Sequence, residues 1–273
     1  MKWSILFVIF SCAYARPELT DLLQAEPNEI LSQFVPSCKA LLQNASPLLP
    51  QLPPSPFPSK QEYLRLGNKA VQEMKSLVES DVETTWPEVE REDDDYKIYS
   101  KKSPFKELKE DLLMLETTAK ANISKVATLM APFRGYRAKW DDLYEFNNVI
   151  ENLGNETYII HEAVHSVFVL SARDAVLVCK EEHFGTTLIL GCHNTTHVNV
   201  PEKEDYVRTV QRLVGYYLTP DEKNPHWTKI HAIIGVDLNL KVGFFSSLVN
   251  RFKPGQLVDF VGRLNDAVKN YKF

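Results

Sequence analysis

The chain has 273 residues, of which 44% are hydrophobic and 25% charged, as in an ordinary folded protein with one large domain or two small ones. Its 31 lysines and arginines against 36 aspartates and glutamates give a net charge of −5. This balance argues against nucleic acid as the main partner, because such affinity rests on clustered basic side chains. Ten glycines exclude a collagen-like chain, and four cysteines are too few for a disulfide scaffold.

The first fifteen residues have the pattern of a secretory signal peptide. Lys2 supplies a positive end, residues 3–10 are apolar without interruption, and Ala-Tyr-Ala at 13–15 fits a small-x-small cleavage site. The apolar run is shorter than the ~20 residues that span a bilayer. We therefore expect a secreted, extracellular protein that is processed before Arg16.

Residues 16–60 predict short helices followed by a proline-rich linker. Six prolines occur within residues 47–58. Proline fixes φ and removes an amide donor, which favours an extended linker, with a loop packed on the domain as the alternative. A folded domain is then expected over residues 61–273.

The domain opens with an expected helix. Its apolar residues recur at every third or fourth position, as on one buried helical face: Tyr63, Leu66, Ala70, Met74 and Leu77. The acidic stretch at 88–96 (EVEREDDDY) predicts a solvated loop, and it lacks the spacing of an EF-hand calcium loop.

Strands dominate from Lys97 onward. Stretches rich in β-branched and aromatic residues predict them over 158–170, 175–179, 186–190, 206–217 and 229–240. Residues 183–185 (HFG) predict a tight hairpin between two of these strands. A final helix is expected from Pro254, at the first helical position, with an apolar stripe through Leu264 and Val268. This order of elements indicates an α+β fold.

Residues 161–165 (HEAVH) match the H-E-x-x-H signature of zinc hydrolases. On a helix the two histidines could share one metal ion, but on a strand they lie ~13 Å apart and cannot. The flanking YII and SVFVL are typical of a strand. We therefore expect neither a metal site nor an enzyme, and zinc-dependent hydrolysis remains the alternative.

Glu162 falls on the opposite strand face from His161 and His165 and would point into a cavity if the sheet faces one. Arg173, which begins the next strand, offers it a partner, because a buried carboxylate and a buried guanidinium need each other. Such a pair would suit a ligand with one hydroxyl or carbonyl. A surface salt bridge is the alternative.

From about Tyr63 to Tyr271 the chain resembles the START family of lipid-transfer domains, and its sterol-binding members most. Four stretches carry the resemblance: residues 139–141 (KWD), 161–162 (HE), 171–179 (SARDAVLVC) and 235–250, which include GVDL and FFSSLVN. The resemblance implies a helix-grip fold, in which a curved antiparallel sheet holds a long C-terminal helix around an apolar tunnel. Unlike most members, this chain has a signal peptide, and residues 16–60 have no counterpart in the domain.

The resemblance further implies a carrier without enzymatic activity or cofactor, which the signal pattern predicts to be secreted. Glu162 and Arg173 would face the tunnel, and Phe260, Leu264 and Val268 would line it from the closing helix. A sterol is the first candidate cargo, with phospholipid, fatty acid or carotenoid as alternatives. Delivery would allow transient contact with a membrane.

Cysteines and glycosylation sequons give the remaining expectations. Cys179 and Cys192 would lie opposite each other if the hairpin turns between Gly185 and Thr186, and could then form a disulfide bond. Buried thiols are the alternative, and Cys38 is left over in either case. The sequons expected to carry glycans are Asn122, Asn155 and Asn194, since that at Asn44 is weakened by Pro47.

Overall fold

The computed structural model describes residues 55–167, 170–240 and 244–272, and in the last helix the side chains from Lys253 onward. The helices are α3 (Lys60–Glu79), α4 (Val82–Thr85), α5 (Ile123–Met130), η2 (Pro132–Arg134), α6 (Arg137–Trp140) and α7 (Phe244–Asn270). The expected signal peptide, most of residues 16–60, Cys38 and Asn44 lie outside the described residues. No helix in the described part is long and apolar enough to cross a membrane.

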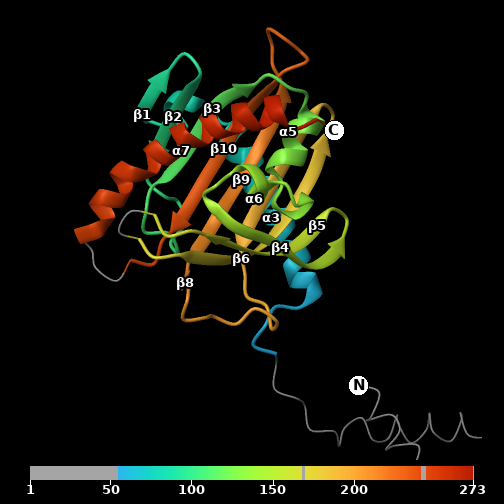
Figure 1. The fold of residues 1–273 in the computed structure, drawn as a ribbon, viewed down its shortest axis with the longest axis vertical. Coiled ribbons are helices and arrows are strands. Elements are labelled where there is room, and N and C mark those ends of the chain that lie inside the picture. The colour runs from blue at the N-terminus through green and yellow to red at the C-terminus, as the bar shows by residue number, and fades with distance from the viewer. Residues whose placement is uncertain (1–54, 168–169, 241–243, 273) are drawn as a thin grey trace, which may run out of the picture. The chain divides into compact units, whose positions relative to one another are not determined.

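One curved sheet organises the domain (Figure 1). Its strands are β1 (Glu88–Asp93), β2 (Tyr96–Lys101), β3 (Leu112–Ala119), β4 (Tyr144–Gly154), β5 (Thr157–Val164), β6 (Arg173–Phe184), β7 (Thr187–Asn194), β8 (Val207–Arg208), β9 (Val210–Pro220) and β10 (Thr228–Asp237). Along the sheet the order is β1-β2-β3-β10-β9-β7-β6-β5-β4, every neighbouring pair is antiparallel, and β8 pairs in parallel with β6. This arrangement confirms the expected helix-grip fold.

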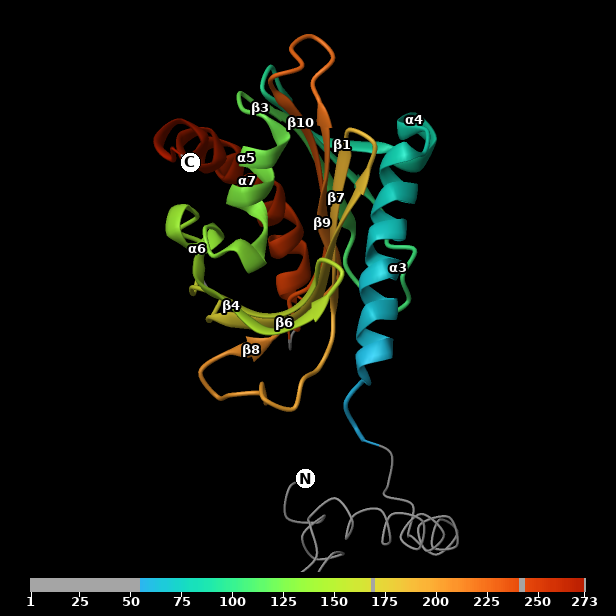
Figure 2. The same ribbon diagram turned by 90° about the vertical axis from the view of Figure 1, so that its right-hand side faces the viewer.

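Helices cover the two faces of the sheet unequally. Figure 2 shows the sheet edge-on, with α3 on one side and α5, α6 and α7 on the other. Ser59 caps the start of α3 by accepting a hydrogen bond from the amide of Glu62 at 3.2 Å. The buried face of α3 includes Ala70 and Met74, as the apolar spacing predicted, and it packs against β6, β7 and β9. The cavity described below lies on the other side.

Two glycines allow close packing, one beneath α3 and one beside the neighbouring strand β7. Gly191 in β7 and Gly215 in β9 are paired neighbours in the ladder. A Cβ atom on Gly191 would lie 2.6 Å from the carbonyl carbon of Ala70, and one on Gly215 would lie 2.1 Å from the carbonyl oxygen of Leu190. Neither position has room for a larger residue.

Three element predictions are wrong in their details. The acidic stretch expected as a loop instead forms β1, an exposed edge strand that pairs with β2. The strand expected over 158–170 ends at Val164. The last helix begins at Phe244, ten positions before Pro254, which is therefore an interior residue. Its first turns were missed because Pro254 was interpreted as the first helical position, although the preceding apolar residues also recur at helical spacing.

The hairpin of β6 and β7 turns as predicted. Phe184 pairs with Thr187, so that Gly185 and Thr186 form the turn, and Cys179 then lies directly opposite Cys192. The two cysteines form a disulfide bond with their Cα atoms 4.1 Å apart. Both are buried on the cavity side of the sheet, among residues such as Ile160.

Candidate functional site

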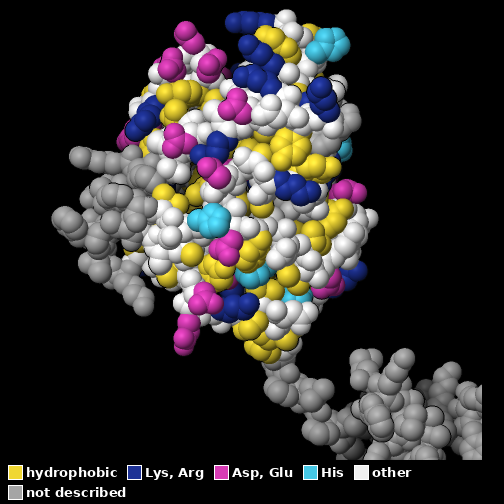
Figure 3. Space-filling view, viewed as in Figure 1, with side chains coloured by type: hydrophobic (Ala, Val, Ile, Leu, Met, Phe, Trp, Pro, Cys, Tyr) yellow, Lys and Arg dark blue, Asp and Glu magenta, His cyan; other side chains and the backbone are white. Residues whose placement is uncertain are grey.

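A cavity of about 230 Å³ lies between the concave face of the sheet and α7. Its walls come from β5, β6, β9 and β10, from the β5–β6 connection, from the segment around α6, and from α7. Most of the lining is apolar, for example Val214, Ala232 and Leu257. On the molecular face that carries α7, hydrophobic side chains lie scattered among charged ones (Figure 3). The site is therefore a mostly apolar cavity beneath α7.

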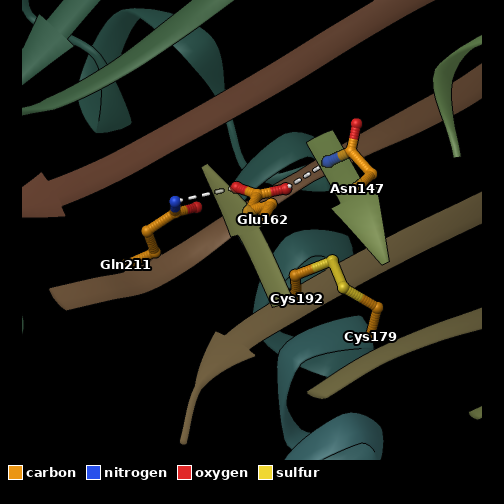
Figure 4. Close-up of a disulfide and its surroundings, with 5 residues drawn as sticks. All are labelled: Asn147, Glu162, Cys179, Cys192 and Gln211. Atoms are coloured by element: carbon orange, nitrogen blue, oxygen red, sulfur yellow. Dashed lines mark hydrogen bonds between the residues drawn. A yellow bond between two sulfur atoms is a disulfide. The ribbon is translucent and has the colours of Figure 1, made fainter. Parts of the chain in front are cut away.

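Glu162 projects from β5 into this cavity and is buried. Its two carboxylate oxygens accept hydrogen bonds from amide groups on other strands, Asn147 Nδ2 at 3.0 Å and Gln211 Nε2 at 2.9 Å (Figure 4). Burial raises the pKa of the Glu162 carboxyl, and the two hydrogen bonds and the charge of Arg137 only partly oppose this effect. Glu162 is thus a polar group in an apolar wall.

Arg173 also lines the cavity, but it does not pair with Glu162 as predicted. Its Nη1 donates to the carbonyl oxygen of Ser171 and, at 3.4 Å, to the hydroxyl of the same residue. Burial lowers the pKa of the Arg173 guanidinium. Instead, the amides of β4 and β9 donate hydrogen bonds to the two oxygens of Glu162.

A second polar group in the wall was not predicted. Arg137, in α6, forms a buried ion pair with Asp141 at 2.5 Å and donates to the hydroxyl of Tyr216 at 3.0 Å. Asp141 also accepts a hydrogen bond of 2.8 Å from Nε of Arg263 in α7. One carboxylate therefore links two arginines of the cavity wall. The i, i+4 spacing of Arg137 and Asp141 could have indicated this ion pair, but only if a helix had been predicted at α6.

Aromatic rings hold the Arg137 guanidinium in place. Its central carbon lies 4.8 Å from the ring centre of Trp140, 4.9 Å from that of Tyr144 and 4.7 Å from that of Phe260. Cation–π contacts of this kind stabilise a guanidinium that is removed from water. Phe260, predicted as a cavity residue of the last helix, does line the cavity.

Leu264 and Val268 were also predicted to line the cavity, and that prediction is wrong. Both are buried in the hydrophobic core on the same side of the sheet, together with residues of α5 such as Leu129. They lie one and two turns beyond Phe260, where α5 and α6 contact α7. The helix therefore lines the cavity along its middle and is core further on.

The HEAVH segment does not have the geometry of a zinc site. His161 and Glu162 lie in strand β5, and His165 lies beyond its end. His161 instead forms a contact of 3.0 Å with Asp174, which also binds Arg208 through two hydrogen bonds of 2.8 Å. Within the described residues no three His, Cys, Asp or Glu side chains are arranged to hold a metal ion.

Two of the three predicted glycosylation sequons are open to solvent. Asn122 is exposed and caps α5 by accepting a hydrogen bond from the amide of Lys125 at 3.0 Å. Asn155 is exposed in the β4–β5 turn with a φ of 51°. Asn194 is half-buried at the end of β7.

Comparison with known proteins connects this cavity to a family. The model of the START domain matches residues 68–272. StAR-related lipid transfer protein 6 of Homo sapiens is 24% identical over 141 residues, which cover 50% of this chain but only 63% of that protein. The mitochondrial steroidogenic acute regulatory protein of Gallus gallus is 23% identical over 229 residues, covering 83% and 79%.

A solved structure has the same fold. Human StAR-related lipid transfer protein 5 superposes with a TM-score of 0.70 and 19% sequence identity, covering 77% of this chain and 98% of that chain. The residues matched by the START model, 68–272, include the sheet and the last helix, which are the elements that enclose the cavity.

Proposed function

The chain belongs to the START domain family, and on that premise we propose that it is a non-catalytic carrier that holds one hydrophobic molecule in the cavity beneath α7. Members of this family are lipid-binding and lipid-transfer proteins. The observation that supports the proposal is the cavity itself, a mostly apolar chamber with a few buried polar groups in its wall. Burial of an apolar body there supplies affinity at ~25 cal/mol per Å² before ordering costs.

A sterol is the first candidate for this cargo. The cavity of about 230 Å³ lies just below the ~300–1,000 Å³ that is usual for ligand sites, so a rigid sterol requires a modest outward shift of its walls. A single acyl chain adapts more readily to the cavity as it stands. A phospholipid with two chains needs the largest expansion and is the weakest candidate of the three.

We propose further that the carrier is secreted. The N-terminal signal pattern supports this proposal. So does the disulfide bond of Cys179 and Cys192, since such bonds persist mainly in oxidising compartments. The sequons at Asn122 and Asn155 are exposed where a glycan could be attached.

Mass spectrometry of organic extracts tests the carrier. The full chain is purified from the medium of a secreting host, and its N-terminal residue shows whether processing occurs before Arg16. We expect about one lipid molecule per protein. In the variant Ala232→Phe, whose new ring occupies the cavity, occupancy should fall by more than half.

A matched control is Val149→Phe, which adds the same ring at an exposed position of β4. Its occupancy should equal that of the wild type. A wild-type protein that carries no lipid and takes up none from vesicles would overturn the carrier proposal.

A further inference from the structure

The Arg173 side chain is a buried cation without an acidic partner. Only 7% of Arg173 is exposed, and it lines the cavity. Its sole hydrogen bonds within the described chain run from Nη1 to Ser171, and its buried Nε has no partner. The Nε–Nη2 edge of this guanidinium is therefore unused. That planar edge is the one that binds both oxygens of a carboxylate at once.

The acidic side chains in the cavity wall are all engaged elsewhere. Asp174 is held by two hydrogen bonds from Arg208, and Asp141 is shared by two other arginines. Glu162 accepts its hydrogen bonds from neutral amides. The described wall thus offers Arg173 no carboxylate.

Energetics indicate what the missing partner must be. A buried charge costs several kcal/mol unless an opposite charge and hydrogen bonds compensate it. A hydroxyl, such as that of a neutral sterol, has one oxygen and no charge, so it would satisfy one donor and leave the cation uncompensated. A carboxylate would satisfy two donors and the charge together.

We propose that the cargo is an anionic lipid, with an apolar body in the cavity and a carboxylate that binds the Nε–Nη2 edge of Arg173. This inference rests on the proposed carrier function and specifies its substrate class. The apolar body follows from the wall that contains Val214, Ala232 and Leu257, and the acidic head follows from Arg173.

Two pairs of probes test the head group. The full chain is stripped of lipid and titrated calorimetrically with laurate and dodecanol, and with cholesteryl hemisuccinate and cholesterol. The members of each pair share an apolar body and differ in the terminal carboxylate. In at least one pair, the acid should bind the wild type at least tenfold more tightly than its neutral partner.

Substitution of Arg173 assigns this preference to the guanidinium. In Arg173→Met the affinity for the acid should fall at least tenfold, while that for the neutral partner stays the same. Arg173→Lys keeps the charge without the planar edge and should lie between them. Arg65→Met, at an exposed arginine of α3, is the control and should bind like the wild type.

Equal binding of acid and neutral probes, or a preference that survives in Arg173→Met, overturns the anionic cargo and leaves the carrier intact. If Arg173→Met does not fold, the wild-type ratio and Arg173→Lys decide. If no probe binds, the lipid extracted from the secreted protein decides, because an acidic lipid supports the inference and a neutral one overturns it. Absence of both probe binding and extracted lipid overturns the carrier itself.

Discussion

Glu162 and Asp141 are both buried carboxylates in the wall of the cavity, but the side chains that contact them differ in charge. Asp141 is contacted by the guanidinium groups of Arg137 and Arg263. Glu162 receives only neutral amide donors, and burial raises its pKa above the ordinary value of 4.5. The folded protein therefore binds a proton at Glu162 more tightly than the unfolded chain does.

This difference predicts how stability depends on pH. The proton on Glu162 stabilises the fold fully below pH ~4.5, and that contribution is lost as the pH rises through the folded-state pKa. Glu162→Gln cannot ionise. The free energy of unfolding of the variant minus that of the wild type should therefore increase from pH 5 to pH 8, by up to about 1.4 kcal/mol for each tenfold difference in proton affinity between the folded and unfolded states.

Thermal unfolding of both proteins across this range measures the effect. Val149→Ala, at an exposed position of β4, should show a constant difference from the wild type at every pH. A difference for Glu162→Gln that falls with rising pH would contradict the assignment of a raised pKa to this residue.

At the scale of elements, close packing depends on two positions without side chains, Gly191 beneath α3 and Gly215 beside the neighbouring strand β7. Gly191 and Gly215 are paired in the sheet, and an added Cβ on either would meet backbone atoms. Backbone atoms of a packed helix cannot rotate away as a flexible side chain would. The helix or the strand would have to move as a whole.

Gly191→Ala should therefore lower the free energy of unfolding by about 1–3 kcal/mol, the usual cost of overpacking. Gly262→Ala is the matched control, because Gly262 is exposed in α7 and a Cβ there meets nothing within 4 Å. It should raise stability by about 0.5–1 kcal/mol through helix propensity. Urea unfolding compares them, and equal effects would show that α3 does not rest on the sheet at Gly191.

Elements with a strong local pattern could be predicted from the sequence. α3 and the strands β6, β7 and β10 were expected because their apolar residues follow a helical or strand pattern. β1 was missed because no hydrophobic pattern marks it. All six of its residues are exposed, and the strand is defined by its backbone pairing with β2. α5 and α6, of eight and four residues, are too short for a periodic signal.

The residues of the site also divide into those that could be predicted from the sequence and those that could not. The position of Glu162 on the inner face followed from strand alternation, and the pairing of Cys179 with Cys192 followed from the turn. The partners of Glu162 were not predicted, because Asn147 lies opposite it on β4, a strand that the sequence pattern did not reveal, and Gln211 lies on β9, which is not a neighbour of β5 in the sheet. Long-range register decides such contacts.

At the scale of the whole molecule, the two faces of the sheet differ in what covers them. α3 covers one face, and the cavity, α5, α6 and α7 lie on the other. A bound cargo contacts α7 and the inner strands but not α3. The cargo should therefore stabilise α7 and the inner strands more than α3.

Removal of lipid should lower the melting temperature, since a ligand present at a hundred times its dissociation constant contributes about 2.7 kcal/mol. Hydrogen exchange should become faster in α7 and in the segment around α6. α3 is the internal control and should exchange at the same rate with and without lipid. Uniform acceleration in all helices would contradict a cargo seated beneath α7.

Pro254 makes the stiffness of α7 differ along its length. A proline inside a helix removes one backbone hydrogen bond, so bending costs less there than at any other position. Lys253, next to it, binds Glu110 and the carbonyl of Val236, whereas Leu264 and Val268 are fixed in the core. Bending at Pro254 breaks the contacts of Lys253 and leaves the core contacts in place. A bend at Pro254 would therefore cost the fold less than a bend at the level of Leu264 and Val268.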